Sequence, residues 1–362
     1  MITSDKIEIR FNKILRNFFF HIIFWYLSLL FYTFLTGEKQ IFKVYLNLLE
    51  VENVYLIILF LSIWISILFS LIDMIFSDRI VRFFPRRFMI FLKSSLYLAT
   101  AFVLILIAAK SPITSFPYET YSELFKHLPE IDIIFIRFLA YFYLAGFLIN
   151  FLKATIKKVG RANFKNWVLG MMNKPREEER IFMFIDMKSS TTIAETLEHK
   201  KFSHLVQDVF NDLAVVDNYY GEIYQYLGDG AIISWNIKTG LKHNNFIKAF
   251  YAFTYVIHKR HRYYARKYGH IPQFKAGVHA GKVMVLQVGQ IRRDISYNGD
   301  TINTAARIES MCNEYKQSFL ISGDLLKMLA EPKEFSFKEV GDIKLKGKRK
   351  STSIFQVRQK RT

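Results

Sequence analysis

Four apolar runs dominate the first 152 residues of this chain and limit the folds available to it. They span about 17–36, 54–76, 88–109 and 131–152, and each is near the ~20 residues that a helix needs to cross a bilayer. Four buried helices of a water-soluble bundle would show polar faces at helical spacing, whereas these runs are apolar nearly all round. The sequence therefore predicts an all-α, four-helix transmembrane domain over 1–152.

Basic residues are unevenly divided among the connections between these runs. One group stands before the first run and between the second and third: Lys6, Arg10, Lys13, Arg16, Arg79, Arg82, Arg86 and Arg87. The other two connections carry fewer, diluted by acids: Lys39, Lys43, Lys110 and Lys126. Because cytoplasmic loops carry the excess of Lys and Arg, we expect a multi-pass protein of the inner (cytoplasmic) membrane with both termini in the cytoplasm.

The formal net charge of +19 is then explained by basic residues of the chain that lie near the membrane surface. Basic residues that follow the fourth run could rest on anionic lipid headgroups: Lys153, Lys157, Lys158, Arg161 and Lys165. Nucleic acid is not an expected partner, since no nucleic-acid-binding signature accompanies the charge. His21 and Arg137 lie within or near the apolar runs, where they could bind a ligand or a headgroup, snorkel toward the membrane surface, or be paired inside the bundle.

The chain changes character after the fourth run. A charged stretch, 153–180, is predicted to be a cytoplasmic linker, either a connector through which the membrane half acts on the rest or an inert spacer. From 181 to 362, strand patterns cover 180–185, 222–227, 231–235, and a hairpin of 274–279 and 282–288 turning at 280–281; helix patterns cover 190–220, 241–268 and 301–314. This βαββαβ order predicts an α+β, ferredoxin-like domain with helices on one face of its sheet.

Two aspartates in this half, Asp186 and Asp229, each end or follow an apolar strand-like run at a turn. A fold that sets these strands side by side would converge two carboxylates, which suit Mg²⁺ or Mn²⁺ carrying a nucleoside triphosphate. Taken singly, Asp186 could instead be a helix N-cap and Asp229 a hairpin turn residue. Asn303 and Arg307 are four residues apart on one helix face, where an amide and a guanidinium together can hold a ribose and a phosphate.

Five motifs in this half follow one another in the order and at the spacing of a known family. They are FIDMKSST, GEIYQYLGDG, FKAGVHAGKV, NGDTINTAAR and LKGK. Together they resemble the catalytic domain of class III nucleotidyl cyclases, the adenylate and guanylate cyclases. The resemblance covers about residues 176–360 and does not extend to the N-terminal half. It implies a cyclase domain with the ferredoxin-like core, which converts ATP to 3′,5′-cyclic AMP and pyrophosphate.

The resemblance also assigns a metal site and a homodimer. Asp186, Asp229 and the backbone carbonyl of Met187 would hold two Mg²⁺ or Mn²⁺ ions, and the amide groups of the loop 187–191 would cradle phosphate. In this family the metal pair and the Asn/Arg pair of one site come from different subunits. A chain with one cyclase domain is therefore expected to form a homodimer with two composite sites.

Three further residues hold the nucleotide by the same resemblance. Asn303 would orient the ribose, Arg307 would stabilise charge on the α-phosphate, and Lys346 would hold the terminal phosphates. A solvated basic turn is an alternative for Lys346, because other basic residues crowd the same stretch: Lys344, Lys348, Arg349 and Lys350.

The sequence departs from the family pattern where the base is read. Gln225 stands where relatives that use ATP often carry Lys and those that use GTP carry Glu, and Ser296 stands where Asp, Thr or Cys is usual; Asp294 could substitute. The Gln225 amide can face an adenine or a guanine edge, so the base stays open and family frequency alone favours ATP. Lys188 and Ser189 replace a Gly-containing version of the metal loop, which adds a positive charge beside the triphosphate.

A second interpretation is that the chain has the same fold but does not catalyse a reaction. The chain could be a membrane receptor or channel whose soluble half only binds nucleotide. The retained metal pair and Asn/Arg pair argue against it, because binding alone would not need all four residues. Short outer connections leave little room for a ligand domain, so the expected signal for the membrane half is a lipid, a small apolar molecule or a membrane partner.

Overall fold

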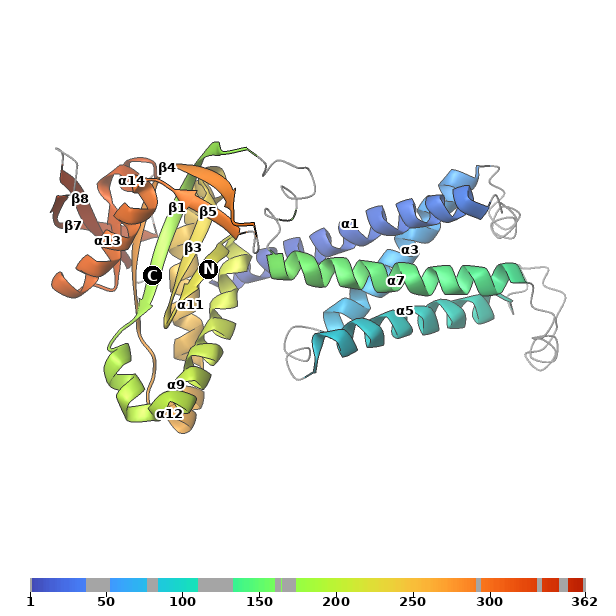
Figure 1. Ribbon diagram of the computed structural model, residues 1–362, viewed down its shortest axis with the longest axis horizontal. Helices are drawn as coiled ribbons and strands as arrows, with labels where there is room; N and C mark the ends of the chain where they lie inside the picture. The colour runs from blue at the N-terminus through green and yellow to red at the C-terminus, as the bar shows by residue number, and fades with distance from the viewer. Residues whose placement is uncertain are drawn as a thin grey trace. The chain divides into compact units, whose positions relative to one another are not determined.

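The computed structural model describes residues 2–36, 53–76, 84–109, 133–159, 164, 174–290, 294–330, 334–344 and 351–360. They form two compact units, Met1–Arg161 and Ala162–Thr362 (Figure 1). Each unit has a hydrophobic core of its own.

Four long helices make up the described part of the first unit: α1 (Ile2–Thr36), α3 (Val54–Ile75), α5 (Arg86–Ala109) and α7 (Ile133–Val159). Among the residues that the structure describes, three segments are long and apolar enough to cross a membrane, namely Ile14–Thr36, Val54–Ile75 and Ile136–Ile156. These findings support membrane association, while a fourth span at α5 and the side of the membrane stay predictions. Helix α7 runs seven residues beyond the predicted span, to Val159, because the first helix breaker after the apolar run is Gly160.

The exterior of this bundle is apolar, unlike that of a water-soluble protein. Large apolar side chains such as Leu27, Phe31 and Leu144 are more than half exposed on its outside. Polar groups instead lie inside: Ser62, Ser66, Ser94 and Asn150 are buried, and each donates a hydrogen bond to the carbonyl four residues earlier in its own helix. Backbone satisfaction within each helix and an apolar exterior are what a lipid environment demands.

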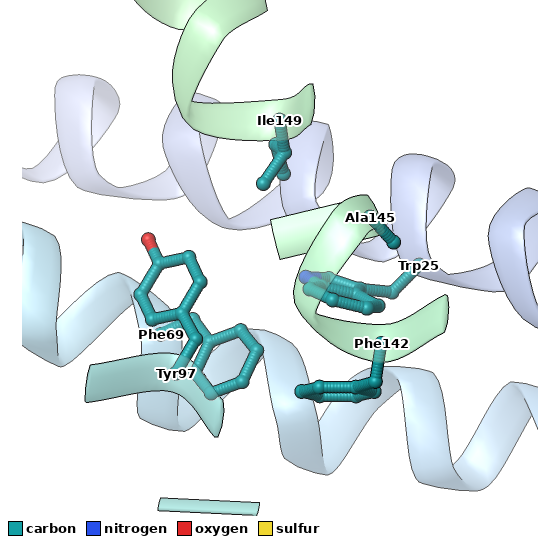
Figure 2. Packing of buried hydrophobic residues seen from close by; sticks show 6 residues of the cluster. All are labelled: Trp25, Phe69, Tyr97, Phe142, Ala145 and Ile149. Atoms are coloured by element: carbon teal, nitrogen blue, oxygen red, sulfur yellow. The ribbon is translucent and has the colours of Figure 1, made fainter. Parts of the chain in front are cut away.

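An aromatic core joins the four helices (Figure 2). Trp25 of α1 stacks on Phe142 of α7 with ring centroids 4.6 Å apart, and Phe69 of α3 stacks on Tyr97 of α5 at 3.9 Å. Trp25 and Phe69 meet edge to face at 5.3 Å, which connects the two pairs. Such ring pairs add specific geometry to the packing of otherwise similar apolar helices.

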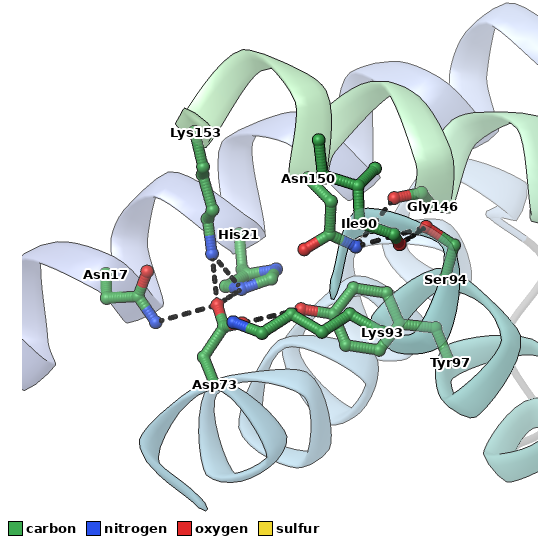
Figure 3. Close-up of polar contacts among 10 residues, drawn as sticks. All are labelled: Asn17, His21, Asp73, Ile90, Lys93, Ser94, Tyr97, Gly146, Asn150 and Lys153. Carbon is green, nitrogen blue, oxygen red and sulfur yellow. Dashed lines mark hydrogen bonds and ion pairs between the residues drawn. The ribbon is translucent and has the colours of Figure 1, made fainter. Parts of the chain in front are cut away.

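Asp73 of α3 lies beside this core at the centre of a polar cluster (Figure 3). Its carboxylate accepts from groups on the three other helices: Asn17 Nδ2 at 3.5 Å, His21 Nε2 at 3.1 Å, Lys93 Nζ at 2.9 Å, Tyr97 Oη at 3.1 Å and Lys153 Nζ at 2.5 Å. Of the alternatives for His21, the structure supports pairing inside the bundle, whereas Arg137 is exposed. Lys153 points into the cluster, not toward lipid headgroups.

The second unit is built on a mixed sheet in the order β2-β3-β1-β4-β6-β8-β7, with β5 paired to β4. Its core is β1 (Arg176–Met187), α9 (Ser190–Leu213), β2 (Glu222–Leu227), β3 (Gly230–Asn236), α11 (Asn245–Lys259) and β4 (Phe274–Val288). The pairs β2/β3, β3/β1 and β1/β4 are antiparallel. This arrangement confirms the predicted α+β, ferredoxin-like βαββαβ core.

Further elements stand between those of the core or follow β4 in the chain. They are α10 (Ile237–Leu241), α12 (His261–Tyr268), β5 (Asp294–Asn298), α13 (Asp300–Glu314), β6 (Phe319–Ser322), α14 (Gly323–Lys327), β7 (Phe335–Lys344) and β8 (Ser351–Gln359). The predicted helix 241–268 is interrupted, since His243 and Asn244 have left-handed backbones and α11 ends at Lys259. The predicted helix 190–220 ends earlier, at Leu213, and continues as the 3₁₀ turns η2 (Ala214–Tyr219).

The predicted hairpin at 280–281 is wrong, because β4 runs unbroken from Phe274 to Val288. The twelve-residue β1 offers a partner along most of its length, from Met187 opposite Phe274 to Arg176 opposite Val285. Gly281 serves close packing instead of a turn: a Cβ there would lie 2.7 Å from Thr301 Oγ1 of α13.

Helices cover both faces of the sheet, so the expectation of a single helical face is incomplete. Phe253 of α11 packs on Phe274 of β4, with ring centroids 4.8 Å apart. Helix α13 lies against the opposite face, where a Cβ on Gly277 would come within 2.0 Å of Glu309 N. Since successive strand residues face opposite sides, Asp186, paired with Lys275, belongs to the α13 face, like Gly277.

Candidate active site

The structure brings Asp186 and Asp229 to one place. Asp186 is the penultimate residue of β1, and Asp229 lies in the turn that joins β2 to β3, next to β1. A Cβ on the neighbouring Gly230 would lie 3.1 Å from Asp186 Oδ1 and 2.7 Å from Ile185 O, so this turn presses against the end of β1. The alternative of Asp186 as a helix N-cap is excluded, because Ser189 occupies the N-cap of α9.

The two carboxylates differ in their partners. Asp186 Oδ2 is 3.1 Å from Lys275 Nζ. Asp229 Oδ2 is buried and has no hydrogen-bond partner in the described part of the chain. A buried carboxylate oxygen without a partner is costly, and a divalent cation would satisfy it, so the residues fit a metal site. Within the described ranges, no three His, Cys, Asp or Glu side chains gather as a metal cage.

Lys275 and Glu309 complete this cluster and were not predicted from the sequence. Lys275 Nζ is 2.6 Å from Glu309 Oε1 as well as 3.1 Å from Asp186 Oδ2. Burial would lower the pKa of Lys275, but the hydrogen bonds that its ammonium donates to Glu309 and Asp186 outweigh this effect and raise that pKa. Burial raises the pKa of Glu309, Lys275 offsets part of the rise, and the charges of Asp186 and Asp229 add to it. Three carboxylates are therefore within electrostatic reach of one another.

Each member of this pair has one partial clue in the sequence. Lys275 is a charged residue between two buried apolar residues, Phe274 and Ala276, and lies directly opposite Asp186 in the β1/β4 register. Glu309 is two residues beyond Arg307 and so projects from a different side of α13. Both clues depend on register and helix packing that the sequence alone did not provide.

The loop after Asp186 leads directly into α9. Met187 is buried, and its backbone ends β1 opposite Phe274. Ser189 has a left-handed backbone, with φ of 55°, and its side chain makes no capping hydrogen bond. Lys188 Nζ donates to Ser318 Oγ at 2.7 Å, so its charge is tied to the β6 side of the domain.

Asn303 and Arg307 lie on the outer side of α13. Asn303 is exposed and Arg307 is half-buried, whereas Thr304, Ala305 and Ile308 face the sheet. In the described residues, no ion pair or hydrogen bond joins this pair to Asp186 or Asp229. The pair therefore lies on a different side of α13 from the residues that this helix packs toward the sheet.

The predicted base-reading residues come from neighbouring strand segments. Gln225 is exposed on β2, and Ser296 on β5 donates to Asn298 Oδ1 at 3.0 Å. The rings of Tyr224 and Tyr297, each adjacent in sequence to one of them, are 4.8 Å apart, which brings the two segments together. Asp294 begins β5. Lys346 lies in 345–350, outside the described residues.

Comparison with known proteins agrees with this geometry. Residues 172–359 match the family described as the adenylate and guanylate cyclase catalytic domain. The chain belongs to this family, which confirms the resemblance seen in its motifs.

Individual relatives are adenylate cyclases. Adenylate cyclase 2 of Rhizobium meliloti is 30% identical over 200 residues, which cover 55% of this chain and 55% of that protein. Adenylate cyclase 1 of the same organism is 28% identical over 198 residues, covering 50% of this chain and 27% of that protein. The chain thus spans about half or less of the length of these relatives. Among solved structures, the adenylyl cyclase CyaB from P. aeruginosa has a TM-score of 0.46 at 21% identity, covering 52% of this chain and 97% of that one.

Proposed function

We propose that this protein is a membrane-anchored nucleotidyl cyclase that converts ATP to 3′,5′-cyclic AMP and pyrophosphate. The observation that carries the proposal is the convergence of Asp186 and Asp229, with Asp229 Oδ2 buried and unpartnered. Membership of the cyclase catalytic-domain family and adenylate cyclase relatives support it. The apolar exteriors of α1, α3 and α7 support attachment to the membrane, with the catalytic half and both termini on the cytoplasmic side.

Asp186, Asp229 and the backbone carbonyl of Met187 would hold two Mg²⁺ or Mn²⁺ ions. When bound, such ions neutralise the charge that shifts between the attacking ribose oxygen and the leaving pyrophosphate. The backbone amides at the start of α9 are suited to bind a phosphate, because the Ser189 side chain does not cap them. Lys346 remains the proposed contact to the terminal phosphates.

The second half of each site would come from another copy of the chain. Asn303 would orient the ribose, and the Arg307 guanidinium would stabilise charge on the α-phosphate. The outward position of this pair on α13, away from Asp186 and Asp229, supports a composite site. A homodimer with two-fold symmetry supplies two such sites.

The assay that tests the proposal measures cyclic AMP and cyclic GMP from the full chain in detergent or vesicles, with ATP and GTP supplied separately in Mg²⁺ and in Mn²⁺. Asp229→Ala should reduce turnover to less than about a tenth of wild type, because both ions need this carboxylate. Asp324→Ala, which removes a well exposed carboxylate of α14, is the matched control and should keep full activity. A folded Asp229→Ala protein that retains more than about a tenth of the turnover contradicts the two-metal assignment.

Complementation between variants tests the composite site. Asp186→Ala spoils the metal half of a site, and Arg307→Ala spoils the phosphate half, so each homodimer should be nearly silent. In a mixed dimer one site receives both lesions and the other receives none. Co-expression should therefore recover about a quarter of wild-type activity, since about half of the dimers are mixed and each has one intact site of two. Mixed dimers that form but stay silent exclude a site shared between chains.

A guanylate cyclase and a receptor that only binds nucleotide are the alternatives. Preference for GTP in the assay above would support the first, and Gln225 accommodates either base. Bound but unconverted nucleotide on the wild-type chain would support the second.

A further inference from the structure

Lys275 and Glu309 stand beside the two aspartates and have no role in the mechanism above. The Lys275 ammonium is buried, at 7% exposure. It lies 2.6 Å from Glu309 Oε1 and 3.1 Å from Asp186 Oδ2, so it is held between two carboxylates, with the shorter contact to Glu309. Glu309 is the more buried partner, with its side chain 15% exposed against 36% for Asp186.

The position of this ammonium has a consequence for cation binding. A metal ion on Asp186 would compete with Lys275 for the same carboxylate, because both are cations that need its oxygen atoms. Counting Asp186, Asp229 and Glu309 against Lys275 gives the cluster a formal charge of −2 (three acids minus one base). This net negative charge favours the binding of divalent cations.

We propose that Lys275 and Glu309 are positioning residues that set the affinity of the Asp186–Asp229 site for divalent cations. Glu309 holds the ammonium by its shorter contact, so that Lys275 orients the Asp186 carboxylate without neutralising it. Gly277 makes this possible, because only a residue without a Cβ lets α13 approach β4 closely enough for Glu309 to reach Lys275. The inference rests on the proposed function, since it concerns the metal site of that function.

Removing either charge should shift metal affinity in opposite directions. Lys275→Met changes the formal charge of the cluster to −3 and removes the competitor at Asp186 Oδ2, so cation binding should tighten. Glu309→Gln changes the charge to −1 and leaves Lys275 to Asp186 alone, so binding should weaken. A unit charge this close to a divalent ion, in a partly buried site, corresponds to a change of at least about tenfold in each direction. The double variant restores the charge of −2 and should bind within about threefold of wild type.

The test titrates Mn²⁺ alone onto the full chain in detergent and measures free Mn²⁺ by its electron paramagnetic resonance signal. Thermal denaturation of each variant is recorded beside it. Lys248→Met removes a comparable ion pair with Glu334, 3.4 Å long and partly buried in the same unit, and should leave Mn²⁺ affinity unchanged. Lys275→Arg keeps the positive charge and should bind Mn²⁺ with the affinity of the wild-type chain. This variant keeps the test usable even if Lys275→Met folds poorly.

Opposite shifts in the two single variants, cancelled in the double variant, establish the proposal. If the role of the pair is purely structural, all variants should lose thermal stability, and Mn²⁺ affinity should shift in one direction only or not at all. That result would overturn the proposal. Failure of the proposed function is distinguishable, since then the wild-type chain itself would neither bind Mn²⁺ nor form a cyclic nucleotide. In that case the inference falls together with the function.

Discussion

Asp73→Asn should destabilise the membrane half far more than removal of either lysine that contacts Asp73. Asparagine keeps the size of the side chain but carries no charge, so it leaves Lys93 and Lys153 as two cations without a counter-ion. Their side chains are only 17% and 21% exposed. Breaking a buried pair by removing one partner costs about 3–5 kcal/mol. The partial exposure of both lysines favours the lower limit, so we expect a loss of about 3 kcal/mol.

The single lysine variants should behave differently, because two ammonium groups share one carboxylate. After Lys153→Met, Asp73 keeps Lys93 Nζ at 2.9 Å and Tyr97 Oη at 3.1 Å. One charge-assisted hydrogen bond is lost, but repulsion between the two lysines disappears as well. The net cost should be below about 1.5 kcal/mol, and Lys93→Met should resemble it. Adding Lys153→Met to Asp73→Asn should recover part of the loss, because one of the two unpaired cations is gone.

The assay unfolds the full chain in a mild detergent by adding a denaturing detergent, and follows the helical circular dichroism signal. Asp324→Asn is the control, because Asp324 and Lys327 form a pair 4.0 Å long whose side chains are 59% and 81% exposed. An exposed pair contributes about 0–1 kcal/mol. If Asp73→Asn costs no more than Lys153→Met, the carboxylate is not the centre of the cluster and the reasoning fails.

Two other predictions concern the catalytic half. Gln225→Glu should shift substrate preference toward GTP and Gln225→Lys toward ATP, because Glu accepts from guanine N1 and Lys donates to adenine N1; equal ATP/GTP rate ratios in all three proteins would show that Gln225 does not touch the base. Burial would raise the pKa of Asp208, but hydrogen bonds from Lys267, Tyr263 and Tyr268 lower it. Asp208 therefore stabilises the fold above the ordinary Asp pKa of about 4 and loses this contribution as pH falls through its lowered value. Asp208→Asn should lower the melting temperature at pH 7 but not at the acid end of a pH series, and a deficit that persists at low pH would contradict the ionic origin.

The elements with strong local signals were predictable from the sequence. The described apolar helices and the βαββαβ order follow from hydrophobic pattern and turn residues, which act over a few residues. The unbroken β4 did not follow, because Gly281 is consistent with a turn until its neighbour Thr301 is known. The small residues of β4 allow α13 to pack closely on this strand. Because α13 is distant from β4 in sequence, local sequence patterns do not reveal this contact.

Some residues of the candidate active site could also be predicted from local sequence patterns, and others could not. Asp186 and Asp229 were predictable because each stands at a turn after a strand, where the motif order marks them. Lys275 and Glu309 were not, since a lysine in a strand and a glutamate in a helix are ordinary surface residues in most contexts. Only the strand register opposite Asp186 and the close approach of α13 bring them together.

Each half of the protein contains a carboxylate that is at least partly buried, and the number of its partners indicates what it can do. Asp73 accepts from five donors on three other helices, so it has little remaining capacity for a ligand and acts as an anchor between helices. Asp229 Oδ2 is buried without a partner in the described residues. A buried acceptor in this state destabilises the folded chain. The unused acceptor belongs to the half that resembles a cyclase, and the saturated one belongs to the half that resembles a membrane anchor. A cation bound in the catalytic half would therefore gain an interaction that the fold has left open, whereas one placed at Asp73 would first have to displace two lysines.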